Sequence, residues 1–310
     1  MTPPLPLVAR GGGGTLAGSL WLPDGPARAL VLMHPGSGPS DRDNDAFFPP
    51  VRGALLAAGA AVASYDKRGV GGSEGSWLTT AIPDQADDAA AGLRVARTAL
   101  GAAGGGIGGA AVPTVLFGHS QGGWVVLEAA SRADVAGVVT SSGPAVTPGD
   151  QERFSTATAV RRAGWADADE ALAVFDGLMA LAERGAAYDE ARAWSGVSER
   201  RDVLDRLAAL GAFVPGSREV WELATLLVGH DPQDALRRLR VPLLAVFGDD
   251  DGVVPVERSV AALRGLVPPR LLDVAVLAGG DHRLQSVDGR FVPGYPDVVV
   301  DFVRRVAGAP

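Results

Sequence analysis

A serine stands between two glycines in the stretch Val115–Trp124, which reads VLFGHSQGGW. Gly118 and Gly122 lie two residues before and after Ser120, and a strand-like apolar run precedes them. A serine on a sharp strand-to-helix turn has a strained backbone that tolerates only small residues at these two positions. The pattern therefore predicts a nucleophile above a sheet, with the Gln121 backbone N–H aimed at a developing oxyanion at a helix N-terminus. An ordinary tight turn is the alternative.

A serine nucleophile needs a base, and the chain offers four histidines for that role. His282 is the strongest candidate because it ends Gly279–His282, a glycine-rich loop after a strand-like run. His119 is next to the serine on the turn, so its side chain is expected to point elsewhere and to pack. We expect His34 to order the loop after its strand and His230 to be a surface or capping residue.

Three adjacent aspartates, Asp249, Asp250 and Asp251, follow an apolar run and are candidates for the acid that orients the histidine. The pattern Gly-x-x-Asp-x-x-Val-Pro, which begins at Gly248, favours Asp251. The other two are then turn residues or solvated charges. The carboxylate would hold the imidazole in one tautomer and stabilise the imidazolium that forms during the reaction.

The composition argues against several other kinds of protein. The 310 residues carry a net charge of −8, which disfavours nucleic acid as the main partner because phosphate binding requires a basic surface. The chain has no cysteine, so disulfides and thiolate chemistry are excluded. Its proline-rich start does not read as a signal peptide, and no apolar stretch approaches the ~20 residues of a membrane helix. We expect a soluble, cytoplasmic protein.

Apolar runs alternate with helical patterns along most of the chain, which predicts a doubly wound, mostly parallel α/β sheet. Runs of four to eight apolar residues are typical of strands buried on both faces of such a sheet. They cover residues 29–33, 60–65, 114–117, 135–140, 242–247 and 271–277, after a predicted antiparallel pair at 5–9 and 15–22. Helical patterns cover 84–100, 122–132, 255–266 and 295–306, and the glycine-rich stretch 101–111 is predicted to be a surface loop.

Residues 145–235 interrupt this alternation, because helical patterns follow one another there with no strand between them. These patterns cover 151–162, 167–184, 188–194, 199–210 and 218–228. We predict a helical cap inserted in a core formed by residues 1–144 and 236–310. Its large apolar side chains predict a mostly apolar pocket, although each taken singly is better explained by a core within the cap. They include Phe154, Trp165, Phe175, Met179, Trp194, Phe213 and Trp221.

These motifs together resemble the α/β-hydrolase superfamily over nearly the whole chain. The resemblance rests, in chain order, on His34–Gly38, Asp66–Ser73, the Ser120 turn, the Asp251 loop and His282. The stretch GSGPSDRD, residues 36–43, is similar to a loop of a bacterial esterase and acyl-hydrolase subgroup. In this superfamily the chain order is serine, acid, histidine, which selects His282 as the base.

The resemblance also implies a second oxyanion donor in the loop after the strand at 29–33. By position this donor is the backbone N–H of Ser37, with Gly36 and Gly38 as alternatives, because Pro35 interrupts the usual His-Gly pair. The charged residues nearby are interpreted as structural. Asp66-Lys67-Arg68-Gly69 is expected to be a salt-bridged turn, with Ser73 and Glu74 in the same role. Asp41, Arg42 and Asp43 are expected to pair with one another, and Arg42 lining the pocket is the alternative.

The implied function is a serine hydrolase that cleaves a carboxylic ester or thioester through an acyl-enzyme, without a metal or cofactor. Its substrate is expected to be a small, partly hydrophobic acyl compound, and peptidase or amidase activity is a close variant. The alternatives are a lyase, cyclase or acyltransferase on the same scaffold and a catalytically inactive binding protein. Dehalogenation of haloalkanes is disfavoured because that chemistry needs a carboxylate in place of Ser120.

Overall fold

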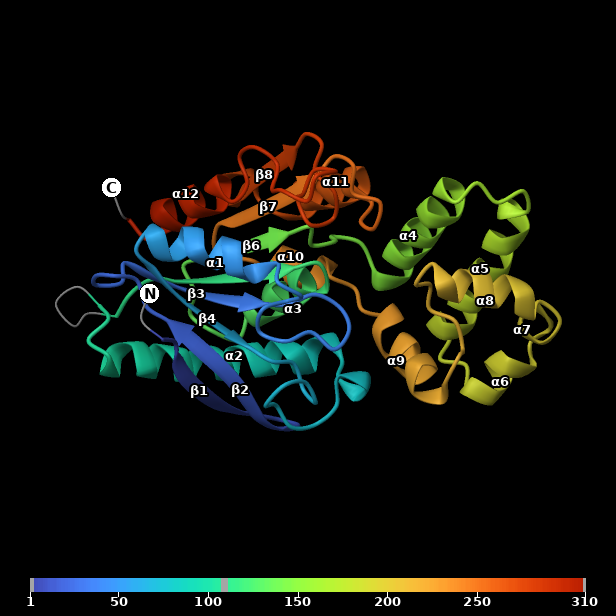
Figure 1. Ribbon diagram of the computed structural model, residues 1–310, viewed down its shortest axis with the longest axis horizontal. Coiled ribbons are helices and arrows are strands. Elements are labelled where there is room, and N and C mark those ends of the chain that lie inside the picture. The colour runs from blue at the N-terminus through green and yellow to red at the C-terminus, as the bar shows by residue number, and fades with distance from the viewer. Residues whose placement is uncertain (1–2, 107–110, 309–310) are drawn as a thin grey trace.

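Eight strands form one twisted sheet in the larger, left-hand part of the molecule in Figure 1. They are β1 (Leu5–Gly11), β2 (Gly14–Trp21), β3 (Ala29–His34), β4 (Ala60–Tyr65), β5 (Thr114–His119), β6 (Gly137–Ser141), β7 (Leu243–Gly248) and β8 (Leu272–Leu277). Their order in the sheet is β1-β2-β4-β3-β5-β6-β7-β8. The computed structural model describes residues 3–106 and 111–308. Only the pairs β1–β2 and β2–β4 are antiparallel among these residues, so the predicted mostly parallel sheet is confirmed.

Alternating side chains of the central strands enter two different hydrophobic cores, one on each face of the sheet. On β3, Leu30 and Leu32 enter one core, whereas Val31 and Met33 enter the other. This two-sided burial explains why the predicted strands read as unbroken apolar runs. The prediction is wrong for β8, which lies at the edge of the sheet and is only half-buried, with Val276 48% exposed.

Helices cover both faces of the sheet (Figure 1). On one face the core includes side chains of α2 (Ile82–Ala102), α3 (Gln121–Ala129), α10 (Gln233–Arg238) and α11 (Val256–Leu266). On the other face it includes those of α1 (Phe48–Ala57) and α12 (Asp297–Val306). The sequence patterns did not predict α1 or α10. Helix α2 also takes up the start of the predicted loop 101–111, of which residues 107–110 lie outside the described residues.

The chain between β6 and β7 is helical, as predicted for an insertion. It forms α4 (Pro148–Arg162), α5 (Ala168–Glu183), α6 (Tyr188–Ala193), α7 (Ser195–Ser198), α8 (Arg201–Ala209) and α9 (Arg218–Val228), followed by α10. Helices α4 to α9 lie together beyond one end of the sheet, toward which strand β6 points (Figure 1). They share a hydrophobic cluster of their own, which includes Phe175 and Trp221. No helix in the described part of the chain is long and apolar enough to cross a membrane.

Candidate active site

The parallel strands bring the predicted functional residues to one edge of the sheet. In the strand register, His34 of β3 pairs with Gly118 of β5, and His119 pairs with Ser141 of β6. The loops that follow β3, β4, β5, β7 and β8 therefore leave the sheet at the same edge. Open α/β sheets bind their ligands at this carboxyl edge.

Ser120 lies at the turn between β5 and α3, as the glycine spacing predicts. Its backbone has φ 53° and ψ −123°, in the region that side chains rarely adopt. A Cβ atom on Gly118 would lie 2.1 Å from the Gly122 carbonyl oxygen. A Cβ atom on Gly122 would lie 2.4 Å from the carbonyl oxygen of His34. Both glycines are therefore required sterically, because a side chain at Gly118 would push the first turn of α3 away from β5, and one at Gly122 would push the turn away from β3.

A chain of hydrogen bonds joins three of the predicted residues. His282 Nε2 lies 2.9 Å from Ser120 Oγ, and His282 Nδ1 lies 2.9 Å from Asp251 Oδ2. The Asp251 side chain is fully buried, and its Oδ1 accepts the backbone N–H groups of Val253 and Val254 at 2.8 and 2.9 Å. The carboxylate is thus fixed by the β7 loop, and it fixes one ring nitrogen of His282. The geometry suits proton transfer from the serine hydroxyl to the ring.

The three neighbouring aspartates have three different partners. Asp249 Oδ1 accepts the backbone N–H of Gly279 at 2.7 Å and so links the β7 loop to the loop that carries His282. Asp250 forms an ion pair with Arg162 of α4 at 2.6 Å. Among the three, Asp251 is the one whose carboxylate contacts His282. Its neighbours are a loop contact and a cap contact, which is more specific than the predicted turn residues or solvated charges.

His119 connects the β3 loop to the loop of His282. Asn44 Oδ1 accepts the Gly36 N–H at 3.2 Å, so the Asn44 amide nitrogen faces His119 Nδ1, at 3.0 Å. His119 Nδ1 therefore accepts, and its Nε2–H donates to the His282 carbonyl oxygen at 3.3 Å. Burial lowers the pKa of His119 well below its usual value, which agrees with a neutral ring. The sequence reasoning predicted a packed His119 but missed Asn44.

The loop after β3 passes directly beside Ser120. A Cβ atom on Gly36 would lie 3.4 Å from Ser120 Cβ. The Gly36 N–H is occupied by Asn44, which leaves the N–H groups of Ser37 and Gly38 as the remaining candidates for an oxyanion donor. Gln121 is the first residue of α3, where backbone N–H groups have no partner within the helix.

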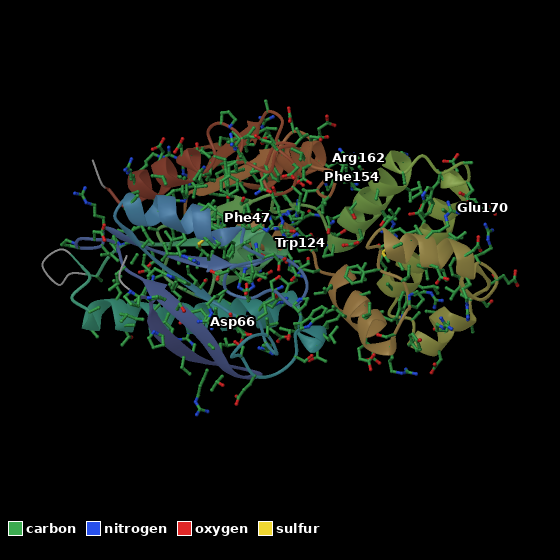
Figure 2. All side chains as sticks on the ribbon, in the orientation of Figure 1. Phe47, Asp66, Trp124, Phe154, Arg162 and Glu170 are labelled. Carbon is green, nitrogen blue, oxygen red and sulfur yellow. The ribbon has the colours of Figure 1, made fainter. Side chains whose placement is uncertain are left out.

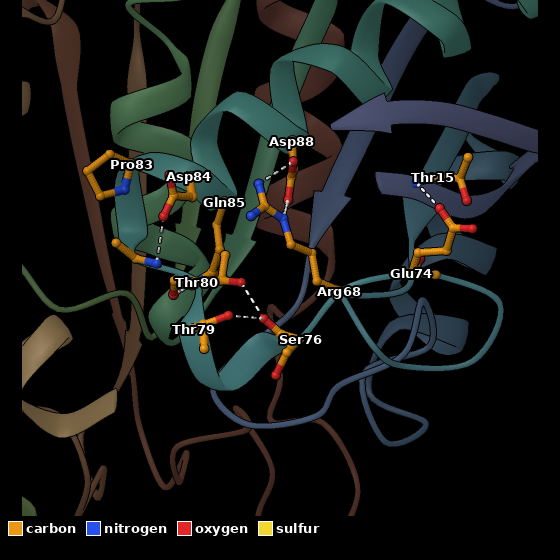
Figure 3. A network of polar contacts seen from close by, with 12 residues as sticks. Thr15, Arg68, Glu74, Ser76, Thr79, Thr80, Pro83, Asp84, Gln85 and Asp88 are labelled. Atoms are coloured by element: carbon orange, nitrogen blue, oxygen red, sulfur yellow. Dashed lines mark hydrogen bonds and ion pairs between the residues drawn. The ribbon is translucent and has the colours of Figure 1, made fainter. Parts of the chain in front are cut away.

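The charged turn after β4 is only partly the predicted salt-bridged structure. Asp66 accepts both the backbone N–H and the guanidinium of Arg42, at 2.6 to 2.9 Å. Arg68 pairs with Asp88 of α2 (Figure 3). Lys67 points the other way, into the cavity wall, and donates to Gln121 Oε1 at 2.7 Å and to the Gly36 carbonyl.

The remaining charged loop residues are structural, with different partners from those expected. Arg42 pairs with Asp66 and not with the neighbouring aspartates, whereas Asp43 pairs with Arg52. Ser73 Oγ accepts the backbone N–H of Ala17 at 2.9 Å and donates to the Asp66 carbonyl at 2.8 Å. Glu74 accepts the backbone N–H of Thr15 at 2.8 Å (Figure 3). These contacts fasten the β4 loop to β2.

A cavity of about 770 Å³ lies over Ser120, between the sheet edge and the inserted helices α4 to α9, for which we keep the short name cap. Its volume lies within the range of small-molecule sites. The predicted cap aromatics contribute little to its wall, because Trp165, Trp194 and Trp221 pack in the hydrophobic cluster of the cap. Phe213 is the one of the named aromatic residues that lines it. The wall given by α4 is largely polar, and consists of Gln151, Glu152, Ser155, Thr156, Thr158, Ala159 and Arg162.

Helix α4 carries this polar wall at the junction between core and cap (Figure 2, Phe154 and Arg162 labelled). The Glu152 carboxylate makes no hydrogen bond or ion pair with any residue that the structure describes, and burial raises its pKa to about 7. The Thr156 hydroxyl is buried and likewise has no partner among those residues. Both groups therefore keep unused hydrogen-bonding capacity.

The other two histidines contribute to the surroundings of the site. His34 lines the cavity and approaches Gln85 Oε1 at 3.4 Å, and burial together with the charge of Lys67 lowers its pKa to about 3. His34 is thus a neutral wall residue. His230 is half-buried after α9, where its ring and the Trp124 ring lie edge to face with their centroids 6.2 Å apart.

The fold agrees with comparisons to known proteins. The family model described as serine aminopeptidase, S33, matches residues 25–286. A Thermogutta terrifontis esterase with malate bound is 20% identical, with a TM-score of 0.55 over 99% of this chain and 100% of that chain. Est1E from Butyrivibrio proteoclasticus, with ferulic acid bound, is 15% identical, with a TM-score of 0.58 over 96% of each chain. At these identities the likeness shows a shared fold.

A curated relative matches only a short part of the chain. The biotin biosynthesis bifunctional protein BioHC of Teredinibacter turnerae is 38% identical over 86 residues, which are 27% of this chain and 15% of that protein. The family model covers most of the chain, and the fold is that of hydrolases. The protein therefore belongs to the α/β-hydrolase superfamily, in the serine aminopeptidase S33 family.

Proposed function

We propose that this protein is an esterase or thioesterase that works through Ser120, His282 and Asp251. The observation that carries the proposal is the hydrogen-bonded chain from Ser120 Oγ through His282 to a buried Asp251, beneath a cavity of about 770 Å³. Membership of the family supports serine hydrolysis. The similar fold of known esterases supports a carboxylic ester as the substrate. Residues 145–235 would act as a cap over this site, on a core formed by 1–144 and 236–310.

The proposed reaction has two acyl-transfer steps. Ser120 Oγ attacks the carbonyl carbon while its proton passes to His282 Nε2, and Asp251 stabilises the imidazolium. The carbonyl oxygen becomes an oxyanion, which the backbone N–H groups of Gln121 and Ser37 would bind. The bond to the leaving group breaks as His282 returns the proton to it. Water, deprotonated by His282, then attacks the acyl-enzyme and releases the acid and Ser120.

The test is covalent labelling followed by turnover. Intact mass spectrometry after treatment with a fluorophosphonate is expected to show one adduct on the wild type and none on Ser120→Ala. Release of the free acid from a panel of p-nitrophenyl esters and acyl thioesters is expected to follow. An unlabelled wild type would contradict the proposal. A labelled enzyme that passes its acyl group to an added alcohol or amine, without releasing acid in water, would identify a transferase instead.

A second candidate is an aminopeptidase or amidase that acts on a substrate with a free amino group. The observation that favours it is Glu152, whose carboxylate faces the cavity with no partner among the described residues. A substrate ammonium bound there would stabilise the carboxylate and lower its pKa. For an amine substrate, KM is then expected to fall as the pH rises through about 7 and to become independent of pH in Glu152→Gln. Equal KM values for amine and neutral substrates in both proteins would rule this candidate out.

A further inference from the structure

Lys67 is the only lysine of the chain; all 27 other residues of the Lys and Arg total are arginines. It is buried, with 8% of its surface exposed, and it lies in the wall of the cavity. Its neighbours Asp66 and Arg68 both form ion pairs, whereas Lys67 forms none with the residues that the structure describes. Its ammonium instead donates to two neutral oxygens, the Gly36 carbonyl and Gln121 Oε1.

These two oxygens belong to the two segments that would supply the oxyanion donors. The Gly36 carbonyl and the Ser37 N–H are parts of the same peptide group. That group is planar and trans, so its C=O and N–H point in opposite directions. A carbonyl fixed on Lys67 Nζ therefore fixes the direction of the Ser37 N–H. The same Nζ holds the side chain of Gln121, whose backbone N–H is the other proposed donor.

We propose that Lys67 is the positioning residue of the oxyanion hole, which fixes the Ser37 peptide and Gln121 with one ammonium group. The inference rests on the proposed function, because it assigns the orientation of the donors that this reaction would use. An ammonium bound to a carbonyl oxygen also polarises the peptide and makes its N–H a stronger donor. A compact group with three donors suits two converging oxygens better than the planar fork of an arginine.

The charge of Lys67 is expected to depend on pH near neutrality. Burial lowers its pKa to about 7, and no carboxylate offsets this effect. The ionisable groups that line the same cavity include His34 of β3 and His119 of β5, which are neutral, Asp66 and Arg68 of its own turn, Asp88 of α2, and Glu152 of α4. Below pH 7, Lys67 is charged and its ammonium polarises the Ser37 peptide. Above pH 7, Lys67 is neutral and its amine polarises this peptide less. Acyl transfer should therefore slow as the pH rises through this range.

The first experiment compares acylation in the wild type, Lys67→Met and Lys67→Arg. Lys67→Met is expected to lower kcat by about 10²-fold, the scale of losing an oxyanion donor, with KM changed less than about threefold. It should also weaken a boronic acid inhibitor, whose adduct on Ser120 is anionic, by a similar factor. Lys67→Arg should recover part of kcat and remove the loss of activity at high pH. The control is Arg94→Met, an exposed arginine of α2 that should change neither parameter.

The second experiment needs no variant. Since the chain has one lysine, protein made with [ε-¹³C]lysine gives a single lysine resonance, whose shift reports the charge of Lys67. Its titration midpoint is expected near neutral pH. The midpoint should rise by at least about one pH unit when the boronic acid binds, because the anionic adduct favours the ammonium.

The outcomes separate this inference from the proposed function. If the wild type neither cleaves esters nor forms the boronate adduct, the proposed function fails and the inference falls with it. If the wild type does both, but Lys67→Met keeps its kcat and its affinity for the inhibitor, the inference alone is wrong. It is also wrong if the resonance titrates at the same midpoint with and without the adduct. A variant that merely loses thermal stability leaves the titration of the wild type to decide.

Discussion

The two walls of the cavity differ in how their polar groups are satisfied. At the sheet edge, Asp251, His119 and Lys67 each bond to two or more partners within the core. On the cap side, Glu152 and the Thr156 hydroxyl have no partner among the described residues. The two walls therefore suit different roles in the proposed function. The sheet edge is organised before any ligand arrives, which suits chemistry, whereas the cap leaves bonding capacity for a ligand to fill, which suits selection.

The largest loss of kcat is expected from a variant of the sheet-edge wall that no longer orients His282. Asp251→Asn should lower kcat by about 10³- to 10⁴-fold, because an amide stabilises the wrong tautomer of the ring. Asp250→Asn is the matched control, since Asp250 pairs with Arg162 of the cap, and it should change kcat less than about threefold. Steady-state kinetics on one ester measure both. Similar losses in both variants would mean that the acid has been assigned wrongly.

A smaller loss of kcat, together with a loss of stability, is expected from a substitution of Gly122, which packs against β3. Gly122→Ala would place a Cβ atom 2.4 Å from the His34 carbonyl oxygen, so the turn or the strand must shift. The expected cost is about 2–3 kcal/mol in the free energy of unfolding, and at least a tenfold loss of kcat should accompany it. Gly101→Ala in α2, where a Cβ atom would meet nothing within 4 Å, should stabilise the protein by up to about 1 kcal/mol. Urea denaturation measures both variants.

On the cap side, the open carboxylate should make stability depend on pH. The folded-state pKa of Glu152 is raised to about 7, so the folded protein favours the neutral acid, and stability is lost as the pH rises from the unfolded-state value toward 7. Glu152→Gln mimics the neutral acid. Its Tm should equal that of the wild type at pH 4, below both pKa values, and exceed it by roughly 2–4 °C at pH 8, about 1 kcal/mol. Equal Tm values at both pH values would contradict a raised pKa of the unpaired Glu152 carboxylate.

The smallest effect is expected where the two walls touch. The Arg162–Asp250 ion pair joins α4 to the β7 loop, but both side chains are more than half exposed. Arg162→Gln should therefore change stability by less than about 1 kcal/mol, and the change should vanish in high salt. Thermal unfolding at low and high ionic strength measures this. A larger loss of stability would show that this ion pair holds α4 to the β7 loop more strongly than its exposure predicts.

The strands and the Ser120 turn were predictable because their sequence signals are local. Unbroken apolar runs give β3 to β7, and two glycines at fixed spacing give the Ser120 turn. For β8 the apolar run predicted a strand buried on both faces, which is wrong. An apolar pattern does not show whether a strand has one neighbouring strand or two. Helix α1 begins with prolines, and α10 spans only six residues, so neither carries a clear helical period.

The partners of the charged residues were not predictable, because long-range contacts decide them. The sequence placed Asp66, Lys67 and Arg68 side by side and suggested one salt-bridged turn. In the structure Lys67 departs from its neighbours and contacts residues 31 and 54 positions away. The cap aromatics were ambiguous for a related reason. A helix with an apolar stripe buries it equally well against another cap helix or against a ligand cavity.

The cap has its own hydrophobic cluster, and α10 alone returns the chain across the sheet to β7. The segment β6–α10–β7 is thus a complete parallel crossover without the other cap helices. Helices α4 to α9 can accordingly be viewed as one module, which is joined to the core of the sheet through Leu223 and Leu227 of α9. Under the proposed function, substitutions or insertions in the wall that this module gives to the cavity would change which substrates bind, while the proposed catalytic residues at the strand ends keep their positions. The proposed function thus predicts that selectivity and rate can be engineered on separate parts of one chain.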